Sequence, residues 1–287
     1  MIIFEKFKSK NTTIMKTASK FLFILTFISA SIFILTSCNN SGSSNNSEKD
    51  STDTEQKKEE NTHKVHWAYE GEAAPEAWAT LCEEYADCSG KVQSPVDIST
   101  SVKDATLKPL YLDYVAVKKL DILNNGHSVQ VNYNAGVFVI ENVEYHLLQF
   151  HFHCPSEYTF NGEHFPMEVH LVHADADGNL AVIGVMVKEG AENQFFKKFW
   201  DKLPAKECEV QTYDVEFDAN SFLPADKGYY HLIGSLTTPP CTEGVKWFVL
   251  KTPVEASKAQ IEKIVSCMPK NNNRPVQPLN DRVIKEF

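Results

Sequence analysis

Histidines alternate with apolar residues in two neighbouring segments, Gln-Phe-His-Phe-His at 149–153 and Glu-Val-His at 168–170. Side chains two positions apart in a β-strand point to the same side, so each segment predicts a strand with its histidines on one face. The connection 154–167 is short and contains its own Asn-Gly turn, so the two strands can pair. This pairing would bring three imidazoles together, and it is the strongest constraint on the fold.

The converging histidines, His151, His153 and His170, predict a zinc site. Three protein ligands with one open position are typical of catalytic zinc, whereas structural zinc sites are usually closed by four protein ligands. Gln149 and Glu168 each lie two residues before a proposed ligand, on the same strand face. We expect each of them to accept the second ring N–H of that ligand, which would fix its tautomer and direction.

Alternating apolar and polar residues recur through 65–287, with Asn-Gly and Asp-Gly turns between the runs, and helical patterns are few. No second linker, internal repeat or low-complexity stretch interrupts this part of the sequence. We therefore expect one mainly β (α+β) domain over 65–287 with short peripheral helices. The predicted strands are Ser128–Asn132, Val137–Ile140, Tyr145–His153, Glu168–His173, Leu180–Val187 and Val245–Leu250, and the predicted helices are Ala191–Lys202 and Val254–Cys267.

Residues 1–37 have the features of a lipoprotein-type signal peptide. Lys16 and Lys20 precede the apolar run Phe21–Leu35, which ends in Leu-Thr-Ser-Cys. This run is short for a transmembrane span, which needs about 20 apolar residues. We expect lipid attachment at Cys38, with an ordinary cleaved signal or an anchor helix as the alternatives. The protein would then be exported to the cell envelope, on the periplasmic or cell-surface side.

Residues 38–64 contain no large apolar side chain, so we expect a disordered tether between the anchor and the domain. The formal net charge of −10 argues against a nucleic-acid partner, because such proteins carry clustered Lys and Arg. A small-molecule substrate fits this charge better. We expect contact with a membrane only through the lipid anchor. The oligomeric state stays open, with a dimer as one possibility.

Further motifs extend from position 66 to about 282. They are His-Trp-Ala-Tyr at 66–69, Gln-Ser-Pro-Val-Asp-Ile at 93–98, Ile-Leu-Asn-Asn-Gly-His at 122–127, Gly-Ser-Leu-Thr-Thr-Pro-Pro-Cys at 234–241 and Arg-Pro-Val-Gln-Pro-Leu at 274–279. Together with the histidine segments, and in this order, they resemble the α-carbonic anhydrases. The resemblance implies a large, mostly antiparallel twisted β-sheet with zinc at the bottom of a cone-shaped cleft. It also implies reversible hydration of carbon dioxide to bicarbonate and a proton.

The resemblance further implies that zinc-bound hydroxide attacks CO2 and that water then displaces bicarbonate. Thr237 matches the family's gatekeeper, whose hydroxyl aims the hydroxide, and Glu157 matches the carboxylate that accepts the Thr237 proton. Thr238 matches a polar neighbour that helps to place bicarbonate. The apolar wall that would hold CO2 is matched by Val172, Val182, Leu236, Val245 and Trp247.

His127 matches the family's proton shuttle, a role that suits a side chain titrating near neutrality. Tyr69, Asn125 and Gln130 match polar supports for ordered water on this path. The alternative for His127 is a solvated loop residue. The remaining histidines are expected in structural or solvated positions, and His173 falls on the strand face opposite the ligands.

Cys88 and Cys241 fall where many exported members of the family carry a disulfide. A bridge at this place would stiffen the loop that contains Thr237, and the alternative is a pair of buried thiols. The sequence leaves open the pairing of Cys82, Cys154, Cys208 and Cys267.

Other functions compete with CO2 hydration. Some relatives of carbonic anhydrases have lost zinc ligands and act in binding or adhesion, and a zinc site can also support esterase activity. The complete set of three histidines with Thr237 and Glu157 favours the enzyme over the binding domain. A metalloprotease is disfavoured because the helical His-Glu-x-x-His signature is absent.

Overall fold

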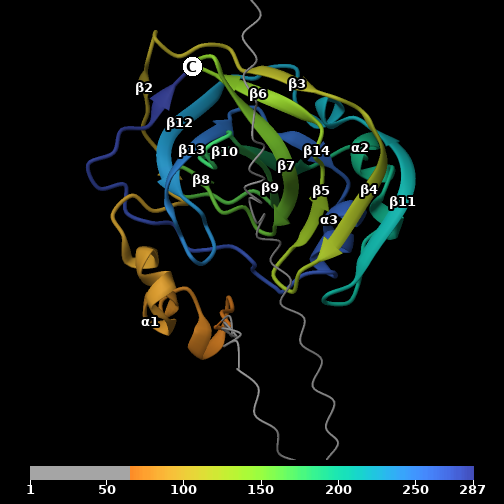
Figure 1. Ribbon diagram of the computed structural model, residues 1–287, viewed down its shortest axis with the longest axis horizontal. Coiled ribbons are helices and arrows are strands. Elements are labelled where there is room, and N and C mark those ends of the chain that lie inside the picture. Colours follow the sequence, from red (N-terminus) through yellow and green to blue (C-terminus); the bar gives the residue numbers. More distant parts are fainter. Residues whose placement is uncertain (1–64) are drawn as a thin grey trace, which may run out of the picture. The chain divides into compact units, whose positions relative to one another are not determined.

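Two adjacent strands carry the histidine segments, β7 (Val143–His153) and β9 (Met167–Ala174) (Figure 1). They pair antiparallel, with His151 directly opposite His170. The alternation in the sequence therefore predicted both strands and their pairing correctly.

The computed structural model describes residues 65–287. The predicted signal peptide 1–37, the predicted tether 38–64 and the proposed lipidation site Cys38 lie outside the described residues.

The described strands form one large sheet and one small one. Besides β7 and β9, the strands are β1 (Asp97–Ile98), β2 (Val102–Lys103), β3 (Tyr111–Tyr114), β4 (Val117–Asn124), β5 (Val129–Asn132), β6 (Gly136–Ile140), β8 (Thr159–Phe160), β10 (Leu180–Glu189), β11 (Val210–Phe217), β12 (Tyr229–Ser235), β13 (Glu243–Leu250), β14 (Val254–Ala256) and β15 (Lys285–Glu286). The large sheet has the order β11-β4-β5-β7-β9-β10-β13-β12-β15-β2, with β14 beside β10 and the pair β3–β6 beside β7. β11 and β2 form two of its edges, at the right and the left of Figure 1.

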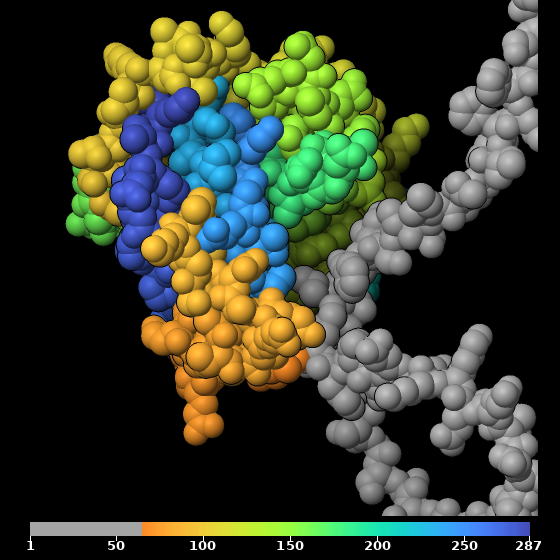
Figure 2. Space-filling model, turned by 60° about the vertical axis from the view of Figure 1, so that its left-hand side comes forward, coloured from red at the N-terminus to blue at the C-terminus, as the bar shows by residue number. Residues whose placement is uncertain are grey.

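Antiparallel pairs predominate in the large sheet. The parallel pairs are β10 with β13, β10 with β14, and β15 with β2, while β1 and β8 form the separate small sheet. Figure 2 shows the C-terminal segment in dark blue along β12 in light blue, which is the β15–β12 pairing. The predicted fold class, a large and mostly antiparallel twisted sheet with short helices, is confirmed.

The helices are shorter than the sequence predicted. They are α1 (Trp78–Leu81), α2 (Gln194–Lys197) and α3 (Lys258–Val265), with 3₁₀ turns at Gly71–Ala73, Glu83–Ser89, Trp200–Lys202 and Ala219–Phe222. None of the helices within 65–287 is long and apolar enough to cross a membrane.

Neither predicted helix forms over its full predicted range. The first is interrupted, and the second begins later than predicted. The prediction Ala191–Lys202 is broken because Asn193 caps α2 with its side chain and the helix ends after one turn. The prediction Val254–Cys267 begins instead as strand β14, which pairs with β10. Helix α3 starts only after Ser257, whose side chain forms a capping box with Gln260.

Apolar side chains pack on both faces of the large sheet. Phe150 and Phe152 of β7 belong to the larger core, together with Val169 and Leu171 of β9. The other face carries a smaller apolar cluster around Trp247. The histidines of β7 therefore point away from the larger core, toward the smaller cluster.

A β-bulge interrupts the pairing of β7 with β9. The register shifts between Leu147, which stands opposite His173, and Gln149, which stands opposite Val172. Before the bulge Tyr145 and Leu147 face the larger core, and after it Phe150 and Phe152 do. The simple alternation predicted over Tyr145–His153 is therefore wrong at this one position, because the extra residue exchanges the two faces of the strand.

Candidate metal centre and active site

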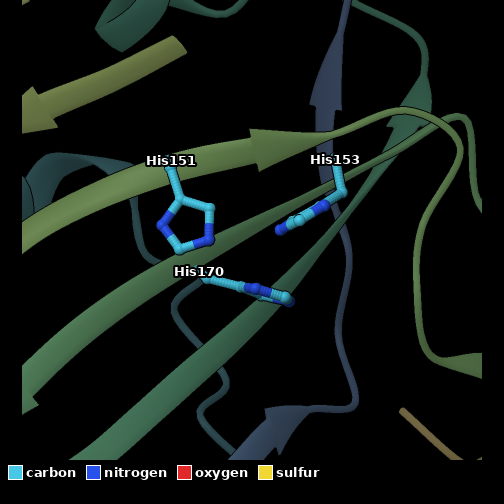
Figure 3. Close-up of side chains that lie close together, drawn as sticks. All are labelled: His151, His153 and His170. Atoms are coloured by element: carbon cyan, nitrogen blue, oxygen red, sulfur yellow. The ribbon is translucent and has the colours of Figure 1, made fainter. Parts of the chain in front are cut away.

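Three imidazoles meet where β7 lies beside β9 (Figure 3). His151 and His153 come from β7 and His170 from β9, and one ligand atom of each lies within 4.8 Å of the other two. His153 and His170 are each 1% exposed, while His151 is partly exposed to solvent. The centre is therefore buried on one side and reachable from the His151 side.

Two predicted side chains hold two of these rings. Nδ1 of His151 lies 2.9 Å from Oε1 of Gln149, and Nε2 of His170 lies 2.9 Å from Oε1 of Glu168. These contacts leave Nε2 of His151 and Nδ1 of His170 available to a metal. The geometry agrees with the orienting contacts predicted for Gln149 and Glu168.

The third ring is held by a main-chain oxygen that the sequence did not point to. Nδ1 of His153 donates a hydrogen bond to the carbonyl oxygen of Asn272 at 2.6 Å. Nε2 of His153 is then left buried without a hydrogen-bond partner. Buried polar atoms are rarely left unpaired, so this nitrogen is an expected ligand atom.

The three imidazoles have the protonation state that a metal needs. Burial lowers the pKa of His153 to about 4 and that of His170 to about 3. Burial also lowers the pKa of His151 well below its usual value, and the neighbouring His153 and His170 lower it further. Three neutral imidazoles with converging lone pairs fit a catalytic Zn²⁺ ion with an open position.

A glycine on the next strand makes room for Glu168. Gly184 of β10 stands opposite His170 in the sheet, and a Cβ atom at this position would lie 2.8 Å from Oε1 of Glu168. The other oxygen, Oε2, accepts hydrogen bonds from the main-chain N–H groups of Glu157 and Tyr158, at 2.8 and 3.0 Å. Glu168 is thus held at Oε2 by two main-chain donors, with its Oε1 placed 2.9 Å from Nε2 of His170.

Thr237 and Glu157 are buried next to the histidines. Oε1 of Glu157 accepts a hydrogen bond from the main-chain N–H of Arg274 at 2.8 Å and lies 3.5 Å from Nδ1 of His153. Burial raises the pKa of Glu157 to about 7, against lowering by His153, by the Arg274 N–H and by the Thr237 hydroxyl. The structure therefore brings Thr237 and Glu157 together.

The residues of the predicted apolar wall belong to one apolar cluster on the histidine face of the sheet. Val182 of β10 stands beside Val172 of β9 and beside Trp247 of β13, so three neighbouring strands contribute to one surface. The ring of Trp247 meets that of His170 edge to face, with 4.8 Å between the centroids. The same cluster includes Val245 and Leu236.

The loop between β4 and β5 carries His127. The imidazole stacks on Trp67, with 3.7 Å between the ring centroids and 9° between the ring planes. Oδ1 of Asn125 accepts hydrogen bonds from the main-chain N–H groups of His127 and Ser128, at 3.0 and 2.7 Å. Burial lowers the pKa of His127 to about 4 in this position, with a smaller contribution from His66. The Asn125 side chain therefore stabilises the main chain of the loop that carries His127.

The other two predicted polar supports have different surroundings. Tyr69 packs against Trp67 and Trp78, and its hydroxyl is buried without a hydrogen-bond partner. Gln130 stands opposite His151 in the β5–β7 pair, and its Nε2 donates to Oδ1 of Asn132 at 2.8 Å.

The disulfide implied by the resemblance is present. Cys88 and Cys241 are bonded, with Cα atoms 4.9 Å apart and a sequence separation of 153. Free cysteines of the described part are Cys82, Cys154 and Cys267. Burial raises the pKa of Cys154 to about 12, which keeps its thiol protonated next to His153.

The same architecture occurs in known proteins. Residues 73–287 match the family model described as eukaryotic-type carbonic anhydrase. A carbonic anhydrase of Klebsiella pneumoniae is 45% identical over 225 residues, which cover 77% of this chain and 91% of the relative. This chain belongs to the α-carbonic anhydrase family.

Solved structures of the family superpose on most of the described part. An α-carbonic anhydrase from Thermovibrio ammonificans, solved with the inhibitor sulfanilamide, has a TM-score of 0.75 and 43% identity, covering 77% of this chain and 99% of that structure. Dioscorin in complex with ascorbate has a TM-score of 0.73 and 33% identity, covering 77% and 98%. As a member of this family the chain is an enzyme, and the family supports CO2 hydration as its reaction.

Two residues of this carbonic anhydrase centre were missed from the sequence, Asn272 and Arg274. The Arg274 guanidinium donates to Oε1 of Gln93 at 2.7 Å and to the carbonyl oxygen of Cys88 at 2.8 Å. Asn272 is 0% exposed and Arg274 is 2% exposed. Arg274 stands in a motif that carries the family resemblance, but its partners lie far away in the sequence, so only the fold reveals them.

His173 occupies the position opposite the ligands, as the alternation predicted. It is 0% exposed, its Nε2 lies 2.9 Å from the Tyr114 hydroxyl, and its Nδ1 lies 3.2 Å from the carbonyl oxygen of Ala181. Both ring nitrogens are therefore used within the larger core of this carbonic anhydrase domain.

Proposed function

We propose that the chain hydrates CO2 reversibly with a zinc ion held by His151, His153 and His170. The observation that carries this proposal is the buried Nε2 of His153, which has no partner although the opposite nitrogen of the ring is fixed. Zinc bound there would act as a Lewis acid and make water a nucleophile at neutral pH. Gln149, Glu168 and the Asn272 carbonyl would keep the three rings aimed at it.

The residues around the zinc ligands have roles that follow from their positions. Glu157 accepts a hydrogen bond from the Thr237 hydroxyl, which would leave the Thr237 oxygen to accept a hydrogen bond from the attacking oxygen and aim it. Carbon dioxide has no net charge, so the apolar surface formed by Val172, Val182 and Trp247 suits it, with Val245 and Leu236 in the same cluster. Thr238, next to Thr237 and partly exposed, would help to place bicarbonate.

The test is stopped-flow CO2 hydration by the purified domain before and after zinc removal with a chelator. We expect a rate above that of the buffer which disappears without zinc and returns when zinc is restored. Activity that survives complete removal of zinc would contradict the proposal, and so would a zinc-loaded protein without activity.

Each turnover releases one proton, and we propose that His127 carries it away. The stacked ring has a pKa of about 4 and accepts protons poorly at neutral pH. We therefore infer that it takes up the proton after turning away from Trp67 toward water. Tyr69 and Gln130 would support ordered water on this path, and Asn125 holds the loop.

His127→Ala should slow CO2 hydration about ten-fold or more in weak buffer, because general acid–base groups contribute about 10²–10⁴-fold. Added imidazole should restore the rate, because a soluble base can take the proton instead. The measurement is kcat as a function of buffer concentration at constant pH. An unchanged kcat in weak buffer would remove the shuttle role from His127.

We also propose that the protein is exported and anchored by a lipid on Cys38. The support is the basic start, the apolar run and the Leu-Thr-Ser-Cys end of residues 16–38. In cells grown with a palmitate analogue, the natural protein should be labelled and sediment with membranes. Cys38→Ser should lose the label and leave the membrane fraction. Equal labelling of both proteins would contradict the anchor.

A further inference from the structure

The side chain of Asn272 lies between the loop that carries His127 and the strand that carries His153. Its Nδ2 donates hydrogen bonds to the carbonyl oxygens of His127 at 3.0 Å and of Phe152 at 2.9 Å. Its Oδ1 accepts a hydrogen bond from the main-chain N–H of Cys154 at 2.8 Å. An amide has two N–H donors, so both are used, and the side chain is 0% exposed.

The main chain of the same residue holds the metal ligand. The carbonyl oxygen of Asn272 accepts the Nδ1–H of His153 at 2.6 Å. Asn272 thus contacts the ligand through its backbone and the shuttle loop through its side chain. A shift of the loop against the strand would have to break hydrogen bonds that no water can replace in this buried place.

The residue after His127 strengthens the same connection. Ser128 is 5% exposed, and its Oγ donates to the carbonyl oxygen of Phe152 at 2.7 Å and accepts from the N–H of Phe152 at 3.2 Å. Phe152 directly precedes His153. Both Asn272 and Ser128 therefore tie the His127 loop to the strand beside this ligand.

We propose that the Asn272 carboxamide is a positioning residue that sets the place of His127 relative to the metal centre. The proposal rests on the proposed function of His127 as the proton shuttle. Without the carboxamide the His127 carbonyl loses its buried donor, and the loop and the imidazole stacked on Trp67 change position. The zinc ligands keep their own contacts, because His153 is held by the main chain.

The decisive variant is Asn272→Leu, which removes the hydrogen bonds of the carboxamide with little change in size. In zinc-loaded protein we expect kcat in weak buffer to fall about ten-fold, since a displacement of about 1 Å can cost up to about a hundred-fold. The kcat/KM for CO2 should change by less than about two-fold, because it reports the step at the metal and not proton export. Imidazole should restore kcat.

A second readout does not depend on activity. In the NMR spectrum, the His127 ring signal can be identified by its absence in His127→Ala. It should move in Asn272→Leu, because the displaced loop changes how the His127 ring lies against Trp67, where the ring centroids are 3.7 Å apart. Zinc content should remain that of the natural protein.

Gln260→Met is the matched control. Gln260 is also a buried amide, 6% exposed, with three hydrogen bonds at the start of α3, away from the zinc ligands. This variant should be less stable but should keep kcat in weak buffer and the His127 signal. If Asn272→Leu does not fold, Asn272→Ser, which retains one donor, carries the same test with a smaller shift.

Three results would overturn the proposal. They are an unchanged His127 signal in folded Asn272→Leu, a parallel loss of kcat, kcat/KM and zinc, and a full additional loss of kcat when Asn272→Leu is combined with His127→Ala. Residues that act through one another give non-additive effects, so the double variant should resemble His127→Ala alone. If His127→Ala itself has no effect in weak buffer, the shuttle fails, while the NMR signal still decides whether Asn272 positions His127.

Discussion

His153→Ala should deprive the protein of its zinc and lower kcat/KM for CO2 by about a thousand-fold or more. A Lewis acid contributes several kcal/mol to catalysis, and about 1.4 kcal/mol corresponds to a factor of ten. Nε2 of His153 is buried without a hydrogen-bond partner, so no neighbouring side chain of the described part takes its place. The measurement is the zinc content after dialysis, by mass spectrometry, together with stopped-flow rates.

His173→Asn is the matched control for this variant. His173 is equally buried and lies on the same pair of strands, but its ring nitrogens contact Tyr114 and Ala181 in the larger core. We expect lower thermal stability with one zinc per chain and nearly natural kcat/KM. If His173→Asn lost zinc as His153→Ala does, the assignment of the ligands by strand face would be wrong.

Replacement of both Cys88 and Cys241 by serine should lower the free energy of unfolding by about 2–4 kcal/mol. The bond spans 153 residues, so without it the unfolded chain gains much conformational freedom. For a domain of this size the midpoint of thermal unfolding should fall by about 5–15 °C, at about 2–4 °C per kcal/mol. Calorimetry measures this change directly.

The double replacement should also lower kcat/KM, because Cys241 ends the turn that begins at Thr237. Cys82→Ser provides the control, since Cys82 is a free and partly exposed thiol. Reduction of the natural protein should reproduce the effect of the double replacement. A melting midpoint within about 2 °C of the natural protein would contradict a stabilising role for the disulfide.

The sequence predicted those parts of the fold that depend on local alternation. Strands β7, β9 and β10 appear within two residues of their predicted limits at either end, because their apolar and polar faces differ clearly. Strands β4, β11 and β12 were not predicted. The local sequence of Val254–Ala256 does not favour helix or strand strongly enough to predict its structure. The segment is a strand because it pairs with β10.

The candidate site was predictable where a side chain lies two positions from its partner. Gln149 and Glu168 were found in this way because strand geometry alone places them beside His151 and His170. Asn272 could not be found from spacing, since it holds His153 from 119 positions away through a main-chain oxygen that every residue possesses. Contacts of this kind are produced by the whole fold and leave no local pattern in the sequence.

The bulge at Leu148 bears on how this protein can tolerate change in length. Downstream of it the odd-numbered histidines point to the candidate metal centre and the even-numbered phenylalanines to the larger core. Upstream of it the odd-numbered residues, Tyr145 and Leu147, face the larger core instead. A substitution at this position leaves the number of residues in the strand unchanged, so both halves of the strand keep their faces. Loss or gain of a single residue here would turn one half of the strand over, which would bury the histidines or expose the core. Insertions and deletions between 147 and 149 should therefore be far rarer among functional relatives than exchanges of the side chain.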